Sequence, residues 1–209
     1  LCAAALLFAT GCPIVGRVVE HYGDSTCFQL IHQLHGTASL RDAGDLWIEA
    51  ACIPGYGLIR QGNYFTGRAQ SIHEHIGTGV QWVVVQLGTN DLASDERYAE
   101  IASDAHLDGV LAAFLVTVPP ASRILGGMPS PNLPQDRLAR VRAALERTPR
   151  PIVILDLEAS LYEPGGHHFT DGPCVPATPE WPWPQSCASV AAGRIVGRLD
   201  ELDLEGAQP

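Results

Sequence analysis

Residues 81–87 read Gln-Trp-Val-Val-Val-Gln-Leu, a short apolar run rich in β-branched side chains. Three valines in a row, without polar alternation, predict a strand buried on both faces, as in a parallel sheet. Other segments predict further strands, at residues 17–22, 45–52, 123–126 and 151–157. Segments with helical apolar spacing lie between or after them, at residues 26–34, 69–76, within 94–115, 134–147 and 186–202. Strands alternating with helices predict an α/β fold layered around a parallel sheet.

The chain length of 209 residues, without an internal repeat or linker, predicts a single domain, which we place at residues 17–204. Hydrophobic residues make up 46% and charged residues 17%, a balance that supports a buried core and excludes a disordered chain. The formal net charge is −10, and the basic residues are scattered arginines. Because cations that neutralise phosphates supply most of nucleic-acid binding, we expect no nucleic-acid partner.

The first twelve residues have the pattern of a targeting segment. Residues 1–8 are apolar, and Ala9-Thr10-Gly11-Cys12 follows. This pattern predicts the end of a signal peptide, or a lipoprotein processing site with a lipidated Cys12 that attaches the protein to a membrane. The alternative is a first strand or helix of the domain. We therefore expect an exported protein, either periplasmic, extracellular or anchored to a membrane.

Four cysteines remain after Cys2 and Cys12, and an even number in an exported chain predicts disulfides. We favour a bond between Cys174 and Cys187, because the segment between them is rich in proline and tryptophan and has no periodicity. Cys27 and Cys52 would form the second bond, with free core thiols as the alternative. No cysteine or histidine spacing indicates a metal site, and we expect no cofactor.

Turn motifs follow the first three predicted strands. They are Gly-Asp-Ser at 23–25, Pro-Gly at 54–55 and Gly-Thr-Asn-Asp at 88–91. In open parallel sheets, functional sites lie at the carboxyl ends of the strands. Acyl transfer needs a nucleophile, a base and donors for an oxyanion. The three turns could supply a hydroxyl, accessible backbone N–H groups and a side-chain amide.

These motifs resemble the SGNH/GDSL hydrolases, a family named for serine, glycine, asparagine and histidine in four sequence blocks. The resemblance to the first three blocks covers residues 17–91. It implies that Ser25 is the nucleophile. It also implies that the oxyanion hole consists of the Ser25 N–H, the Gly55 N–H and the Asn90 amide, with Gly57 as the second choice for the glycine. The implied fold is three-layer α/β/α with a flavodoxin-like parallel sheet.

The fourth block departs from the family pattern Asp-x-x-His, which does not occur in the last third of the chain. One alignment uses residues 165–170, with His168 as the base and Gly165 where the orienting acid belongs. The other uses residues 171–174 and puts Cys174 at the base position, which removes the general base. We favour the first alignment, because it retains an imidazole.

The first alignment leaves two assignments open. The orienting role passes to Asp171, to Glu163 or to a backbone carbonyl, and His167 is the alternative base.

The resemblance implies a serine esterase acting on carboxylic esters or O-acyl groups, such as O-acetyl groups on carbohydrate. Two alternatives stay open. The same site transfers acyl groups to an envelope glycan if an acceptor hydroxyl outcompetes water. An impaired fourth block would leave a binding module for glycans or esters.

Overall fold

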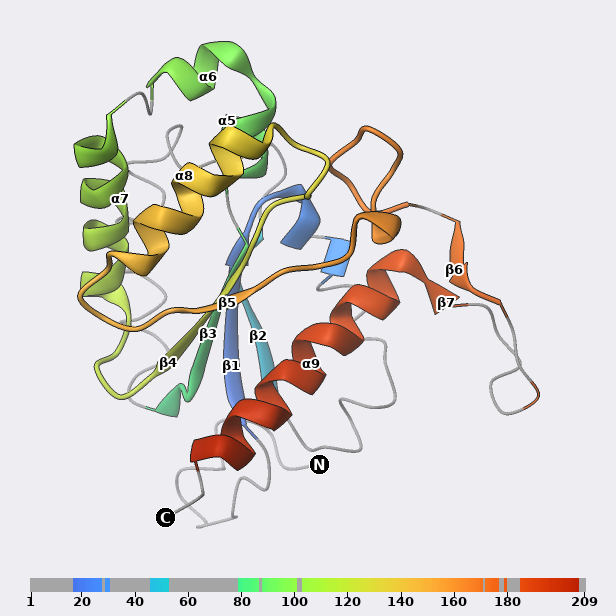
Figure 1. The fold of residues 1–209 in the computed structure, drawn as a ribbon. Coiled ribbons are helices and arrows are strands. Elements are labelled where there is room, and N and C mark those ends of the chain that lie inside the picture. Colours follow the sequence, from blue (N-terminus) through green and yellow to red (C-terminus); the bar gives the residue numbers. More distant parts are fainter. Residues whose placement is uncertain are drawn as a thin grey trace, which may run out of the picture.

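A computed structural model describes residues 17–27, 29–30, 46–52, 79–86, 88–100, 103–170, 172–176, 179 and 185–206. Its central sheet has five parallel strands in the order β2-β1-β3-β4-β5 (Figure 1). Their bounds are β1 Val18–Gly23, β2 Leu46–Cys52, β3 Trp82–Gln86, β4 Arg123–Gly127 and β5 Val153–Leu155. This is the flavodoxin-like order, so the predicted sheet type is confirmed.

Helices cover both faces of the sheet, with α7 and α8 on one side and α9 on the other (Figure 1). The helices named in the structure are α5 Thr89–Ala93, α6 Asp95–Glu100, α7 Asp104–Thr117, α8 Gln135–Glu146 and α9 Cys187–Gly206. Residues 25–27 and 29–30 are also helical. The predicted three-layer α/β/α arrangement is confirmed.

Successive residues of β3 pack into different cores, since side chains alternate between the two faces of a strand. Val83 belongs to the core cluster that contains Leu107 of α7 and Val141 of α8. Val84 belongs to the other cluster, which contains Ile195 of α9. The valines at 83–85 thus contribute side chains to both cores, which explains why polar and apolar residues do not alternate in this strand.

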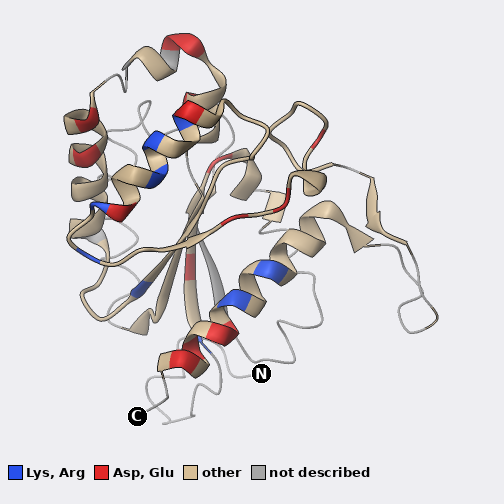
Figure 2. Cartoon of the chain, in the orientation of Figure 1, with Lys and Arg blue, Asp and Glu red and all other residues tan. Residues whose placement is uncertain are grey.

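Ion pairs attach α8 to its neighbours, and Figure 2 shows both basic and acidic residues along this helix. Arginines of α8 and its C-cap residue Arg147 pair with acidic residues of α6, α7 and the segment after β5. The pairs are Arg137–Asp95, Arg140–Asp104, Arg142–Asp156 and Arg147–Asp108. Such surface pairs contribute little energy individually, so the apolar stripe of Leu138, Val141 and Ala144 carries the packing of α8.

The described residues contain two disulfides, and both pairings favoured from the sequence are present. Cys27 is bonded to Cys52 at the end of β2, and Cys174 is bonded to Cys187 at the start of α9. Cys174 lies in β6 (Pro173–Val175), which pairs with β7 (Gln185–Ser186) in a small antiparallel ribbon. In the part of the chain with assigned structure, no helix combines the length and hydropathy needed to cross a bilayer.

Some predicted elements differ from the structure or lie outside it. The segment 94–115 contains α6 and most of α7, with Ser103 as the N-cap of α7. The predicted turn at 88–91 runs directly into α5, because Gly88 takes φ 97° and serves as its N-cap. The targeting segment 1–12 and the helix expected at 69–76 lie outside the described residues.

Candidate active site

The carboxyl ends of β1, β2 and β3 lie level with one another. Gly23 is paired in register with Cys52 of β2 and with Gln86 of β3. A Cβ at Gly23 would lie 2.3 Å from the Cys27 Cβ and 2.5 Å from the Gln86 carbonyl oxygen. Only glycine therefore lets the chain turn so tightly from β1 into the helical segment that begins at Ser25.

Ser25 and His168 meet at this edge of the sheet, although 143 positions separate them in the sequence. The Ser25 Oγ lies 2.8 Å from the His168 Nε2, and both side chains are half-buried. In the neutral tautomer with the proton on Nδ1, Nε2 accepts a hydrogen bond from the serine hydroxyl. This is the geometry in which an imidazole can take the hydroxyl proton as a general base.

A short loop carries His168 to the serine. Tyr162 and Phe169 form an isolated antiparallel bridge, and the Glu163 N–H donates to the His168 carbonyl at 3.0 Å. In the loop between Tyr162 and Phe169, Gly165 takes φ 68°, a left-handed conformation that favours glycine. The residue that stands where the family pattern has aspartate is therefore the glycine of a tight turn.

Residues of the loop that follows β4 also hold this turn through hydrogen bonds. The buried Ser130 donates from its Oγ to the Gly166 carbonyl at 3.0 Å, and Asn132 donates to the Glu163 carbonyl at 3.1 Å. Ser130 also accepts from the Asn132 N–H. No sequence pattern points to Ser130 or Asn132, because their partners are backbone carbonyls 36 and 31 residues away.

His167 lies beside His168, with ring centroids 4.5 Å apart. Burial lowers the pKa of His167, and the neighbouring His168 lowers it further. The imidazole that the structure places against Ser25 is that of His168.

In the described residues, no carboxylate is hydrogen-bonded to the His168 ring. Glu163 is exposed and reaches His168 through its backbone N–H. Asp171, the other candidate for the orienting acid, lies outside the described residues. Cys174 is held in its disulfide with Cys187, which removes the thiol that the second alignment put at the base position.

Asp24 connects the Ser25 turn with the turn that carries Asn90. Its buried Oδ1 accepts from the Thr26 N–H at 2.9 Å and from the Thr26 hydroxyl at 2.7 Å, and Thr89 donates to the same carboxyl group. Burial raises the pKa of Asp24, against the lowering effect of these hydrogen bonds. Asn90 follows Thr89 and is half-buried in α5, the helix that comes after β3, the strand paired with β1. Gly55 and Gly57 lie outside the described residues.

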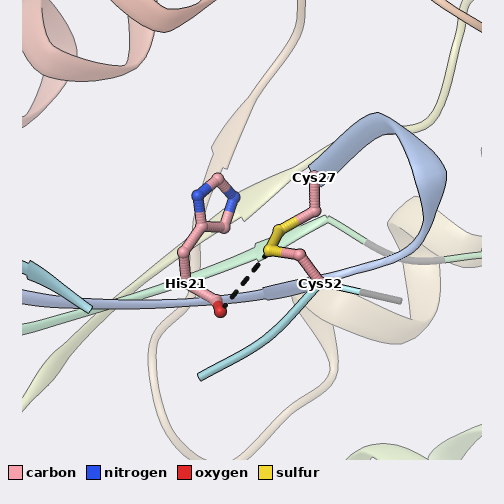
Figure 3. Close-up of side chains that lie close together, drawn as sticks. All are labelled: His21, Cys27 and Cys52. Atoms are coloured by element: carbon pink, nitrogen blue, oxygen red, sulfur yellow. Dashed lines mark hydrogen bonds between the residues drawn. A yellow bond between two sulfur atoms is a disulfide. The ribbon is translucent and has the colours of Figure 1, made fainter. Parts of the chain in front are cut away.

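A second polar cluster lies near the carboxyl ends of β1 and β2. His21, Cys27 and Cys52 are buried, and their possible ligand atoms lie within 4.8 Å of one another (Figure 3). The two sulfurs are bonded to each other, so they offer no thiolate to a metal in this oxidised form. The His21 Nε2 lies 3.0 Å from the Gln86 Oε1, and burial lowers the pKa of His21 to about 4. This cluster therefore acts as a structural support of the β1 end.

Comparison with known proteins identifies the fold. No protein-family model matches the sequence, and no curated protein matches it. Among solved structures, protein YXIM_BACsu from Bacillus subtilis matches with a TM-score of 0.56 and 15% identity, over 91% of this chain and 58% of that one. The native aryl esterase of M. smegmatis matches with a TM-score of 0.51 and 14% identity, over 87% of this chain and 99% of that one.

The fold class is therefore a three-layer α/β/α sandwich around a parallel sheet. Within that class it is the SGNH hydrolase fold, so the resemblance that the sequence blocks indicate is confirmed at the level of the fold.

Proposed function

We propose that this protein is a serine esterase that hydrolyses carboxylic esters or O-acyl groups, O-acetyl groups among them, through an acyl-enzyme on Ser25. The observation that carries the proposal is the 2.8 Å contact between the Ser25 Oγ and the His168 Nε2 at the carboxyl edge of the sheet. An aryl esterase with the same fold supports this reaction class.

The first half of the reaction forms the acyl-enzyme. The Ser25 Oγ attacks the ester carbonyl carbon while its proton passes to the His168 Nε2. Negative charge develops on the carbonyl oxygen, and the N–H groups of Ser25 and Gly55 and the Asn90 amide donate to it. When the tetrahedral intermediate collapses, the C–O bond to the alcohol breaks, and His168 gives its proton to the leaving oxygen.

The second half releases the acid. His168 takes a proton from a water molecule, whose oxygen attacks the acyl carbon. Collapse of this second intermediate breaks the bond to the Ser25 Oγ, which regains the proton from His168. The carboxylic acid leaves and the site returns to its starting state.

The test compares p-nitrophenyl acetate hydrolysis by the wild type, Ser25→Ala and His168→Ala, with His167→Ala as the matched control. We expect kcat to fall by ~10³-fold or more in the first two variants, since removing a nucleophile or base leaves only residual catalysis. His167→Ala should keep most of its activity. Circular dichroism checks that each variant is folded.

Other outcomes separate the alternatives. Loss in His167→Ala but not in His168→Ala would assign the base to His167. A wild type without Ser25-dependent turnover, and without labelling by a serine-directed phosphonate, would contradict the esterase and leave a binding module. Product analysis with a sugar acceptor present distinguishes hydrolysis from acyl transfer.

We also propose that the protein works outside the cytoplasm. Two disulfides support this location, because reducing compartments rarely keep such bonds. Mass spectrometry of alkylated peptides from the natively expressed protein tests it. Cys27, Cys52, Cys174 and Cys187 should be alkylated only after reduction, and alkylation without reductant would contradict the proposal.

A further inference from the structure

Gln29 lies four residues after Ser25 in the same helical segment, and therefore on the same face one turn later. Its side chain reaches a segment 140 residues away, where it pairs with both backbone groups of one residue. The Gln29 Oε1 accepts from the Phe169 N–H at 3.1 Å, and the Gln29 Nε2 donates to the Phe169 carbonyl at 3.5 Å. Phe169 directly follows His168.

Two hydrogen bonds to the same residue fix both its position and its orientation. Within the described residues, polar links between the Ser25 helix and the His168 loop include the Ser25–His168 contact itself and this Gln29–Phe169 pair. The Phe169 ring is fully buried and stacks on Tyr162 at 4.7 Å, so the loop is anchored on its own side as well. Gln29 therefore sets the distance between the Ser25 helix and the His168 loop.

The need for such a link follows from the base itself. In an acyl-transfer site the imidazole is normally oriented by a third group. Within the described part of the chain no carboxylate holds the His168 ring, and the expected aspartate position is the turn residue Gly165. A firm hold on the backbone beside His168 would therefore help to keep its ring in place for Ser25.

We propose that Gln29 is a positioning residue of this site, which holds the backbone beside His168 at a fixed distance from Ser25. The inference rests on the proposed function and adds a residue to which the resemblance assigns no role. The hydrogen bonds of the Gln29 side chain go to the Phe169 backbone and not to the Ser25 or His168 side chains. Its effect reaches the reaction through Phe169 and His168, where displacement by about 1 Å can cost ~10²-fold in rate.

The experiment measures kcat and KM on p-nitrophenyl acetate for three variants at Gln29. Gln29→Met keeps the length and loses both hydrogen bonds. Gln29→Asn keeps the amide but is too short to reach Phe169, and Gln29→Glu keeps the acceptor for the Phe169 N–H. The matched control is Gln81→Met. The Gln81 Oε1 also accepts a hydrogen bond from a backbone N–H, that of Val18 at 3.2 Å, but it does so at the amino ends of the strands, away from Ser25.

We expect kcat to fall by ~10- to 100-fold in Gln29→Met and Gln29→Asn, with KM within about twofold of the wild type. Gln29→Glu should recover a large part of the loss, and Gln81→Met should keep the wild-type kcat. Amide hydrogen exchange, followed by NMR, should show Phe169 protected in the wild type and exchanging faster in Gln29→Met.

Several results would overturn the inference. One is a wild-type kcat in Gln29→Met, and another is an equal loss in Gln81→Met. If Gln29→Met does not fold, Gln29→Asn decides, and an unchanged kcat there would count against positioning. Absence of Ser25-dependent turnover in the wild type is a different result, because it contradicts the esterase itself.

Discussion

Asn90 and Ser25 follow neighbouring parallel strands, and the buried Asp24 joins their turns through Thr26 and Thr89. This bridge fixes the Asn90 backbone relative to the serine. A side-chain amide held there can donate to an oxyanion that exists only in the transition state. Such a donor raises kcat without strengthening substrate binding.

We therefore expect Asn90→Ala to lower kcat by ~10²–10³-fold and to leave KM within a few-fold of the wild type. Asn90→Asp is the matched variant, because it keeps the size and replaces the two N–H donors by acceptors. It should be as impaired as Asn90→Ala in steady-state hydrolysis of p-nitrophenyl acetate. A near-normal kcat in Asn90→Asp would show that shape, and not hydrogen-bond donation, is what the position supplies.

Single residues differ in how far the sequence could assign them. Ser25 and Asn90 lie in turn motifs after apolar strands, so the rule that sites lie at strand ends points to those turns. The resemblance to the SGNH/GDSL blocks then implies their roles. His168 was favoured because an imidazole is the usual base, and the 2.8 Å contact agrees with that choice. Gln29 left no pattern, because its partner is a backbone group 140 residues away. Contacts of side chains with a distant backbone carry no spacing signal.

At the scale of elements, β1 buries more polarity than its sequence indicates. All six of its residues are buried, and these include Glu20 and His21. The adjacent valines predict a strand here, and a strand histidine is more often a satisfied structural residue than a catalytic one, but the valine pattern does not show that His21 has no exposed surface. It is tolerated because His21 lies against Gln86 of β3 and loses its charge, as its lowered pKa shows.

His21 should make the stability depend on pH. Its pKa in the folded state is about 4, below the value of 6.5 for a free histidine, so the unfolded chain binds more protons between these values. The contribution is fully present above pH 6.5 and is lost as the pH falls toward 4. The loss amounts to roughly 3 kcal/mol by the linkage relation.

Urea unfolding at pH 7 and at pH 4 measures this effect when the wild type is compared with His21→Gln, which can still pair with Gln86 but does not titrate. The stability advantage of the wild type over the variant should shrink by roughly 3 kcal/mol at the lower pH. An advantage that stays constant between the two pH values would assign the acid sensitivity to other groups.

At the scale of the whole molecule, the pattern of β3 alone predicts helices on both faces of the sheet. It does not predict how long the strands are. The Trp82–Val84 run feeds both cores, which requires helices on both faces. The predicted strand at 151–157 is reduced to Val153–Leu155, whose side chains are only half-buried, because β5 is an edge strand paired on one side. An apolar run shows that a segment is buried, but the number of partners beside it decides how far it stays paired.

The two disulfides tie this molecule together at different places, so their removal should have different consequences. In the chain-entropy model, closing loops with sequence separations of 25 and 13 residues contributes about 3 kcal/mol each. Double alanine variants of Cys27 and Cys52, and of Cys174 and Cys187, should therefore lose similar stability in urea unfolding.

The two double alanine variants should differ in catalytic activity. Cys27 lies two residues after Ser25, and its bond to Cys52 fixes the nucleophile helix against the end of β2. Cys174–Cys187 joins β6 to α9, beyond the loop that carries His168. We expect the Cys27/Cys52 variant to lose ~10-fold or more in kcat at temperatures where both proteins stay folded, because small displacements of a nucleophile are costly. The Cys174/Cys187 variant should stay within about threefold of the wild type. Equal losses of kcat would mean that both bonds act on catalysis only through general stability.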